Sequence, residues 1–147
     1  MRVACFLRAG LPGKKSNQGR LAFHQALQEL ELEGGPPMRL KRYQGNAAVL
    51  VDGLSKLGLV PLFKGNEAGP IIQTFLTPRD ANFKFEDFYQ RLRKRGLAIY
   101  PGKLTLRDSF RIGTIGHLNA DMMERVVETV EEVLTAMNVT DMMPRDL

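Results

Sequence analysis

The sequence has little cysteine and no long apolar run, and these absences narrow the classes of protein it can encode. One cysteine, Cys5, cannot form a disulfide within the chain, which suits a reducing compartment and predicts a cytoplasmic protein. No apolar run approaches the roughly 18 residues of a membrane span, so we expect no membrane partner. The histidines, His24 and His117, have no paired ligand at metal-binding spacing, so we expect no metal site.

The positive charge is confined to one part of the chain. The net charge of +5 comes from residues 1–50, which hold eight Lys/Arg and three Asp/Glu, whereas residues 51–147 hold thirteen of each. A second basic cluster at 91–95 closes a predicted helix, where cations complement the helix dipole. We therefore expect no nucleic-acid partner.

Hydrophobic spacing predicts helices over about 18–32, 36–57, 85–92 and from 119 onward. Gly34 and Gly35 end the first, Gly58 the second and Gly96 the third, and Asn119 caps the last. The apolar stripe of the last helix is predicted to contain Met122, Val126, Val130, Val133, Leu134 and Met137. Short strands are predicted at 59–63, 71–76, 97–100 and 109–115.

This order of elements predicts an α+β fold, with a small, mainly antiparallel sheet and helices packed on one face. Residues 1–18 lack periodicity, so we expect a poorly ordered leader there. We divide the chain into this leader, a domain over 19–138 and a tail over 139–147, which we expect to be frayed after about Asn138.

One arginine, Arg111, stands within an apolar strand that ends in glycines. A buried guanidinium without an anion is costly, so Arg111 must reach solvent, pair with a carboxylate of its own chain or bind an anionic ligand. It alternates with Phe110 and Ile112, so it points to the opposite face of the strand. If that face lines a cleft, its planar fork suits a carboxylate; the alternative is an ion pair with Asp108 or a glutamate of the last helix.

Three neighbours are candidates for lining such a cleft: Tyr100, Lys103 and Gly113. Lys103 follows a Pro-Gly turn, where a solvated loop lysine is the simpler interpretation. Gly113 either relieves crowding at the strand end or lets a ligand approach the backbone.

Two sequence blocks carry a resemblance to a known family. The Ile-Tyr-Pro-Gly-Lys block at 99–103 and the Phe-Arg-Ile-Gly-Thr-Ile-Gly block at 110–116 together resemble the C-terminal part of 2-aminoethylphosphonate–pyruvate aminotransferases. The segments at 21–35 and at 42–46 are also similar, and the resemblance covers roughly residues 19–138. It places the chain near class V of the fold-type I pyridoxal phosphate enzymes.

The resemblance implies a fold, a reaction and a residue role. The fold is that of the small C-terminal domain, and the family moves an amino group from 2-aminoethylphosphonate to pyruvate with pyridoxal phosphate, giving phosphonoacetaldehyde and alanine. Arg111 matches the arginine implied to hold the anionic group of the substrate. A homo-oligomer is implied as well.

The chain departs from the family in what precedes the matched segment. None of its lysines matches the Schiff-base lysine, and no catalytic residue can be assigned. We expect a truncated, frameshifted or remnant gene product that alone binds pyridoxal phosphate poorly and does not transaminate. The alternative is a detached domain without chemistry, acting as a binding or self-associating module.

Overall fold

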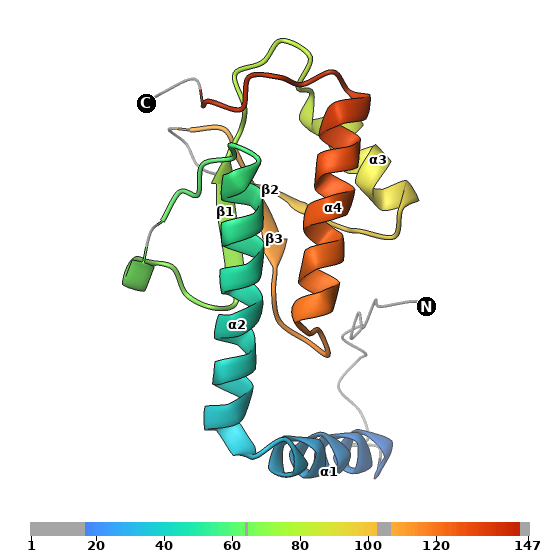
Figure 1. The fold of residues 1–147 in the computed structure, drawn as a ribbon. Helices are drawn as coiled ribbons and strands as arrows, with labels where there is room; N and C mark the ends of the chain where they lie inside the picture. Colours follow the sequence, from blue (N-terminus) through green and yellow to red (C-terminus); the bar gives the residue numbers. More distant parts are fainter. Residues whose placement is uncertain (1–16, 64, 103–106, 145–147) are drawn as a thin grey trace.

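The computed structural model describes residues 17–63, 65–102 and 107–144 (Figure 1). The predicted leader lies outside these ranges except for its last two residues, which begin the first helix. In chain order, the elements are α1 (Asn17–Leu32), α2 (Gly35–Lys56), the 3-10 turn η1 (Gly65–Glu67), β1 (Ile72–Leu76), α3 (Phe85–Lys94), β2 (Tyr100–Gly102), β3 (Ser109–Gly113) and α4 (Ala120–Ala136).

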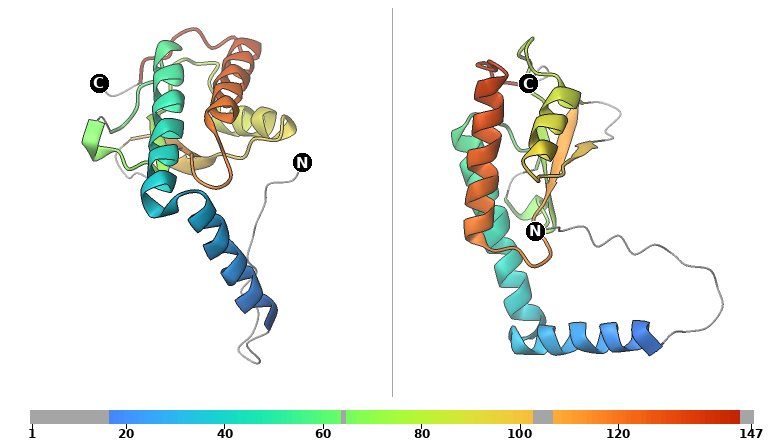
Figure 2. Two further views of the ribbon diagram at one scale, coloured as in Figure 1. Left: turned by 60° about the horizontal axis from the view of Figure 1, so that its bottom comes forward. Right: turned by 90° about the vertical axis from the view of Figure 1, so that its right-hand side faces the viewer.

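The sheet within the described residues has three strands in the order β1-β3-β2, both pairs antiparallel. Its inner face carries Phe75, Phe110 and Ile112, and the phenyl rings of Phe110 and Phe88 of α3 meet edge to face at 5.4 Å. Helices α2, α3 and α4 cover this face, and α2 and α4 lie side by side (Figure 2). The predicted α+β plan, with helices on one face of a small antiparallel sheet, is confirmed.

Helix ends follow the local signals in the sequence. Gly34 and Gly35 take positive φ angles of 99° and 79°, which a residue with a Cβ rarely adopts, and the chain turns there from α1 into α2. The Asn119 side chain accepts a hydrogen bond from the Met122 amide at 3.0 Å, as expected of an N-cap.

Two predictions about methionines are wrong. Met122 is 39% exposed, because it lies at the border of the buried stripe in the first turn of α4, whereas its neighbour Met123 is buried. Met142 belongs to the tail that is expected to be frayed, but it is half-buried and packs against the core.

Two strand predictions are also corrected. The segment 59–63 forms only an isolated bridge between Pro61 and Phe75. The Leu62 amide donates to the Thr74 carbonyl at 2.8 Å and the Leu76 amide donates to the Val60 carbonyl at 2.9 Å, so Pro61 stands at a position where the ladder needs no N–H. The strand expected at 97–100 begins only at Tyr100, because the Leu97 amide donates to the Leu92 carbonyl at 3.0 Å and so completes the end of α3.

The described part of the tail, residues 139–144, is docked, which contradicts the fraying expected there; residues 145–147 lie outside the described ranges. The Asp80 carboxylate accepts hydrogen bonds from the amides of Thr140 at 2.8 Å and Asp141 at 3.0 Å, and Arg79 pairs with Asp141 at 2.6 Å. Val139 is buried in the core. None of the helices in the described ranges is long and apolar enough to cross a membrane.

Candidate functional site: the uncovered sheet face

Arg111 lies in the middle of the sheet face that the helices leave uncovered. In the antiparallel register it stands directly opposite Thr74 of β1 on one side and Tyr100 of β2 on the other. Directly opposed residues share a face, with Cβ atoms about 5 Å apart. Thr74, Arg111 and Tyr100 therefore form one row across the sheet, which we call the Arg111 row.

A hollow lies beside β1, at the Thr74 end of the Arg111 row. Ile72, two residues before Thr74 on β1, is exposed although its side chain is large and apolar. A hollow of about 200 Å³ beside it is lined by Phe63, Glu67, Ala68, Gly69, Ile71, Ile72, Gln73 and Thr74. Thr74 thus belongs both to this hollow and to the Arg111 row.

Arg111 is half-buried, and within the described ranges its guanidinium has no hydrogen bond or ion pair with another side chain. Asp108, the internal partner considered from the sequence, makes no ion pair with it. The last helix lies on the opposite face of the sheet. No carboxylate among the described residues pairs with Arg111. Two of the three alternatives therefore remain: its guanidinium reaches solvent, or it binds an anionic ligand.

The other candidates have different positions. Tyr100 is 57% exposed and stands beside Arg111. Gly113 is exposed at the end of β3, and a Cβ added there would meet nothing within 4 Å, so packing does not require glycine at this position. Lys103 lies outside the described residues.

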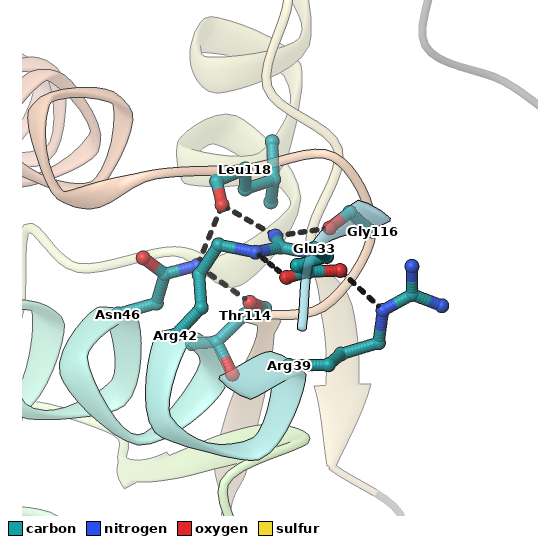
Figure 3. Close-up of polar contacts among 7 residues, drawn as sticks. All are labelled: Glu33, Arg39, Arg42, Asn46, Thr114, Gly116 and Leu118. Atoms are coloured by element: carbon teal, nitrogen blue, oxygen red, sulfur yellow. Dashed lines mark hydrogen bonds and ion pairs between the residues drawn. The ribbon is translucent and has the colours of Figure 1, made fainter. Parts of the chain in front are cut away.

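A second polar cluster lies at the elbow between α1 and α2 (Figure 3). The Glu33 carboxylate accepts one hydrogen bond from Arg42 Nε at 2.6 Å and another from Arg39 Nε at 2.7 Å. Arg42 Nη1 also donates to the carbonyls of Gly116 at 2.7 Å and Leu118 at 2.8 Å. We call Glu33, Arg39 and Arg42 the elbow cluster.

The elbow cluster ties the start of α2 to the loop that follows β3. Beside it, the buried Asn46 amide donates to the carbonyls of Thr114 at 3.1 Å and Leu118 at 3.0 Å. The Thr114 hydroxyl donates to the Pro70 carbonyl at 2.6 Å. These long-range contacts fix the chain on both sides of the Arg111 row, because Pro70 precedes β1 and Thr114 follows β3.

The charges of the elbow cluster compensate one another. Hydrogen bonds from Arg42, and then from Arg39, lower the pKa of Glu33 from 4.5 to about 2. The Arg42 guanidinium also lies 5.0 Å from the centre of the Tyr43 ring. An open groove of about 550 Å³ adjoins the cluster, but both arginines are already partnered by Glu33. We therefore interpret the cluster as a structural bracket rather than a binding site.

Sequence reasoning missed Thr74 and Glu33. Thr74 could be found only from the strand register, which a single sequence does not provide. Glu33 directly precedes the glycine pair, and Arg39 and Arg42 lie in the first two turns of the next helix. This combination of charges is the signal that could have indicated the bracket.

The described residues do not fit the cofactor implied by the resemblance. Their lysines are Lys41, Lys56, Lys84 and Lys94, all exposed and all within or next to helices. None of them lies on the strands that carry the Arg111 row. The part of the chain that the structure describes thus offers no Schiff-base lysine beside Arg111.

Comparison with known proteins identifies relatives that match most of this chain. A 2-aminoethylphosphonate–pyruvate transaminase of Pseudomonas putida F1 is 45% identical over 120 residues, which are 82% of this chain and 33% of that protein. Another, from Paraburkholderia xenovorans LB400, is 47% identical over 118 residues, or 80% of this chain and 30% of that protein. The chain thus spans about a third of the length of these relatives. No protein-family model matches it.

Solved structures share the fold. An alanine–glyoxylate aminotransferase from Nostoc sp. has a TM-score of 0.67 at 22% identity, and a ureidoglycine–glyoxylate aminotransferase from Bacillus subtilis has 0.63 at 24%. Each alignment covers 77% of this chain and 30% of the other. These structures confirm the fold, and the sequence relatives confirm the resemblance: the chain is similar to about a third of a 2-aminoethylphosphonate–pyruvate transaminase.

Proposed function

We propose that this chain is the substrate-binding small domain of a pyridoxal phosphate-dependent transaminase that uses 2-aminoethylphosphonate and pyruvate. The observation that carries the proposal is the position of Arg111, half-buried on the uncovered sheet face with no carboxylate paired to it among the described residues. A guanidinium there suits the anionic end of either substrate, because its fork matches two oxygens at once.

The chain contributes binding and orientation in this proposal. Pyridoxal phosphate, when bound, supplies the electron sink for amino transfer. None of the described lysines lies on the strands of the Arg111 row. In this proposal the Schiff-base lysine comes from outside this chain. In the same proposal the small domain spans residues 19–138, flanked by 1–18 and 139–147, and it works in a cytoplasmic dimer.

Complementation tests the proposal directly. The chain would be mixed with the remaining two thirds of the P. putida relative, and pyruvate-dependent consumption of 2-aminoethylphosphonate would be measured. We expect activity only in the mixture. We expect Arg111→Lys in this mixture to raise the KM for 2-aminoethylphosphonate about tenfold or more, because an ammonium cannot bind two oxygens of the anionic group at once as a guanidinium does. Unchanged kinetics in this variant would reduce Arg111 to a structural role.

The cofactor is tested on the chain alone. Pyridoxal phosphate would be added and the absorbance of a lysine adduct followed, with borohydride to fix any adduct. We expect no stable band. A band that borohydride fixes to one lysine would contradict the proposal that the cofactor lysine lies elsewhere.

A second function, a self-associating module without chemistry, is favoured by α1. This helix has no buried residue, and Leu21 and Phe23 are 68% and 66% exposed. Apolar surface of this kind promotes association. Light scattering on the chain, together with the complementation assay, distinguishes the two functions. Stable self-association without activity in the mixture supports the module. Activity in the mixture supports the transaminase domain.

A further inference from the structure

We propose that Thr74 gives the Arg111 face its preference for a phosphonate over a carboxylate. The inference rests on the proposed function, because it requires that Arg111 hold the anionic end of the substrate. It goes further by assigning a role to a residue that lies 37 positions from Arg111 in the sequence and enters the site only through strand pairing.

The geometry places a hydroxyl beside the guanidinium. Thr74 and Arg111 are direct partners in the β1–β3 ladder, so both side chains leave the sheet on the same side. Their neighbours in the chain, Gln73, Phe75, Phe110 and Ile112, are buried on the other face. Thr74 is half-buried and lines the hollow next to the Arg111 row.

The Thr74 hydroxyl has no hydrogen-bond partner within the ranges that the structure describes. Thr114, a threonine at the end of the same sheet, differs in this respect, because its hydroxyl donates to the Pro70 carbonyl at 2.6 Å. Thr114 therefore serves the fold, whereas the Thr74 hydroxyl can donate to a ligand.

The shapes of the two anions explain why a second donor discriminates between them. A carboxylate is planar, and an arginine fork can satisfy both of its oxygens. A phosphonate is tetrahedral, so when two oxygens face the fork the third points out of that plane. A short hydroxyl beside the guanidinium can reach this third oxygen, and a carboxylate has no atom there.

Tyr100, on the other side of Arg111, is the weaker candidate for this contact. It is 57% exposed and lies on the edge strand β2, so its hydroxyl stands at the end of a long ring on the solvent side. Thr74 has a short side chain on a strand that is paired along β3 and bridged by Pro61 on its other edge. A donor on such a strand is held in place before the ligand arrives.

The test compares two ligands that differ in the anionic group: 2-aminoethylphosphonate and 3-aminopropionate, its carboxylate counterpart. The 147-residue chain would be titrated with each and the amide signals of β1 and β3 followed by ¹H–¹⁵N NMR. Thr74→Val removes the hydroxyl and keeps the branched shape. Thr74→Ser keeps the hydroxyl, and Thr135→Val makes the same change on the exposed surface of α4.

We expect Thr74→Val to weaken phosphonate binding about tenfold, as for loss of a hydrogen bond to a charged group, and to leave the carboxylate Kd unchanged. Thr74→Ser should restore the phosphonate preference, and Thr135→Val should behave as wild type. Spectra and urea midpoints that match wild type would confirm that each variant is folded.

The outcomes separate this inference from the proposed function. In one outcome, Thr74→Val weakens the binding of both ligands equally or of neither, while Arg111→Gln abolishes the binding of both. Thr74 then has no selective role, and the proposed anion site at Arg111 stands. If wild type binds neither ligand, or Arg111→Gln binds both as wild type does, the inference and the proposed anion site both fail.

Discussion

The buried amide of Asn46 offers the sharpest test of how the loop beside the Arg111 row is held. Asn46 is 2% exposed and donates to the Thr114 and Leu118 carbonyls. In Asn46→Ala the Leu118 carbonyl keeps its bond from Arg42, so it stays satisfied. The Thr114 carbonyl loses the donor that Asn46 supplies and remains at a buried site.

The cost follows from these contacts. A buried carbonyl left unpaired costs about 1–3 kcal/mol, and the lost packing of the amide adds about 1 kcal/mol. Alanine is the better helix former by about 0.6 kcal/mol, which offsets part of this loss. We expect Asn46→Ala to lower the free energy of unfolding by about 1.5–3.5 kcal/mol.

The assay is urea unfolding followed by circular dichroism, with linear extrapolation to water. Asn82→Ala is the matched control, because the Asn82 amide also donates to a carbonyl, that of Asn138 at 2.9 Å, but at an exposed site. It should cost about 0.5–1 kcal/mol. If Asn46→Ala costs no more than Asn82→Ala, burial of the amide does not hold this loop.

Three further predictions concern packing, capping and pH. Gly53→Ala should destabilise the fold by about 1–3 kcal/mol, although alanine has the better helix propensity, because the new Cβ would lie 2.6 Å from a Val127 methyl group. A higher free energy of unfolding in urea would contradict the close approach of α2 and α4. Asn119→Ala should cost about 1 kcal/mol in the same assay by removing the cap of α4, and no loss would show the cap to be dispensable. Backbone amides of Asp141, Thr140 and Asn82 lower the pKa of Asp80 from 3.8 to about 2, so its stabilising contribution is complete above pH 3.8 and is lost as pH falls through 2. Asp80→Asn should therefore unfold with a shallower dependence on pH than wild type between pH 5 and pH 2, and equal slopes would show that this clamp adds no stability.

Much of the fold could be predicted because the responsible signals are local. The glycine pair at 34–35 and the cap at Asn119 act within one turn of a helix, and both are where the sequence indicates. The alternation of Phe110, Arg111 and Ile112 predicts that Arg111 faces away from the core, and the burial of its two neighbours agrees. Periodicity and capping depend on residues a few positions apart, so one sequence is enough to read them.

Contacts between distant residues could not be predicted in this way. The docking of the segment after Asn138 could not be predicted, because the Asp80 carboxylate that binds the Thr140 amide lies 60 positions earlier in the chain. The same holds for Thr74, which reaches Arg111 only through the register of β1 on β3, and for Glu33, whose partner Arg42 also binds the loop at 116–118. Spacing along the chain fixes which face of an element a residue occupies, but only strand pairing and helix packing fix which side chains meet across it.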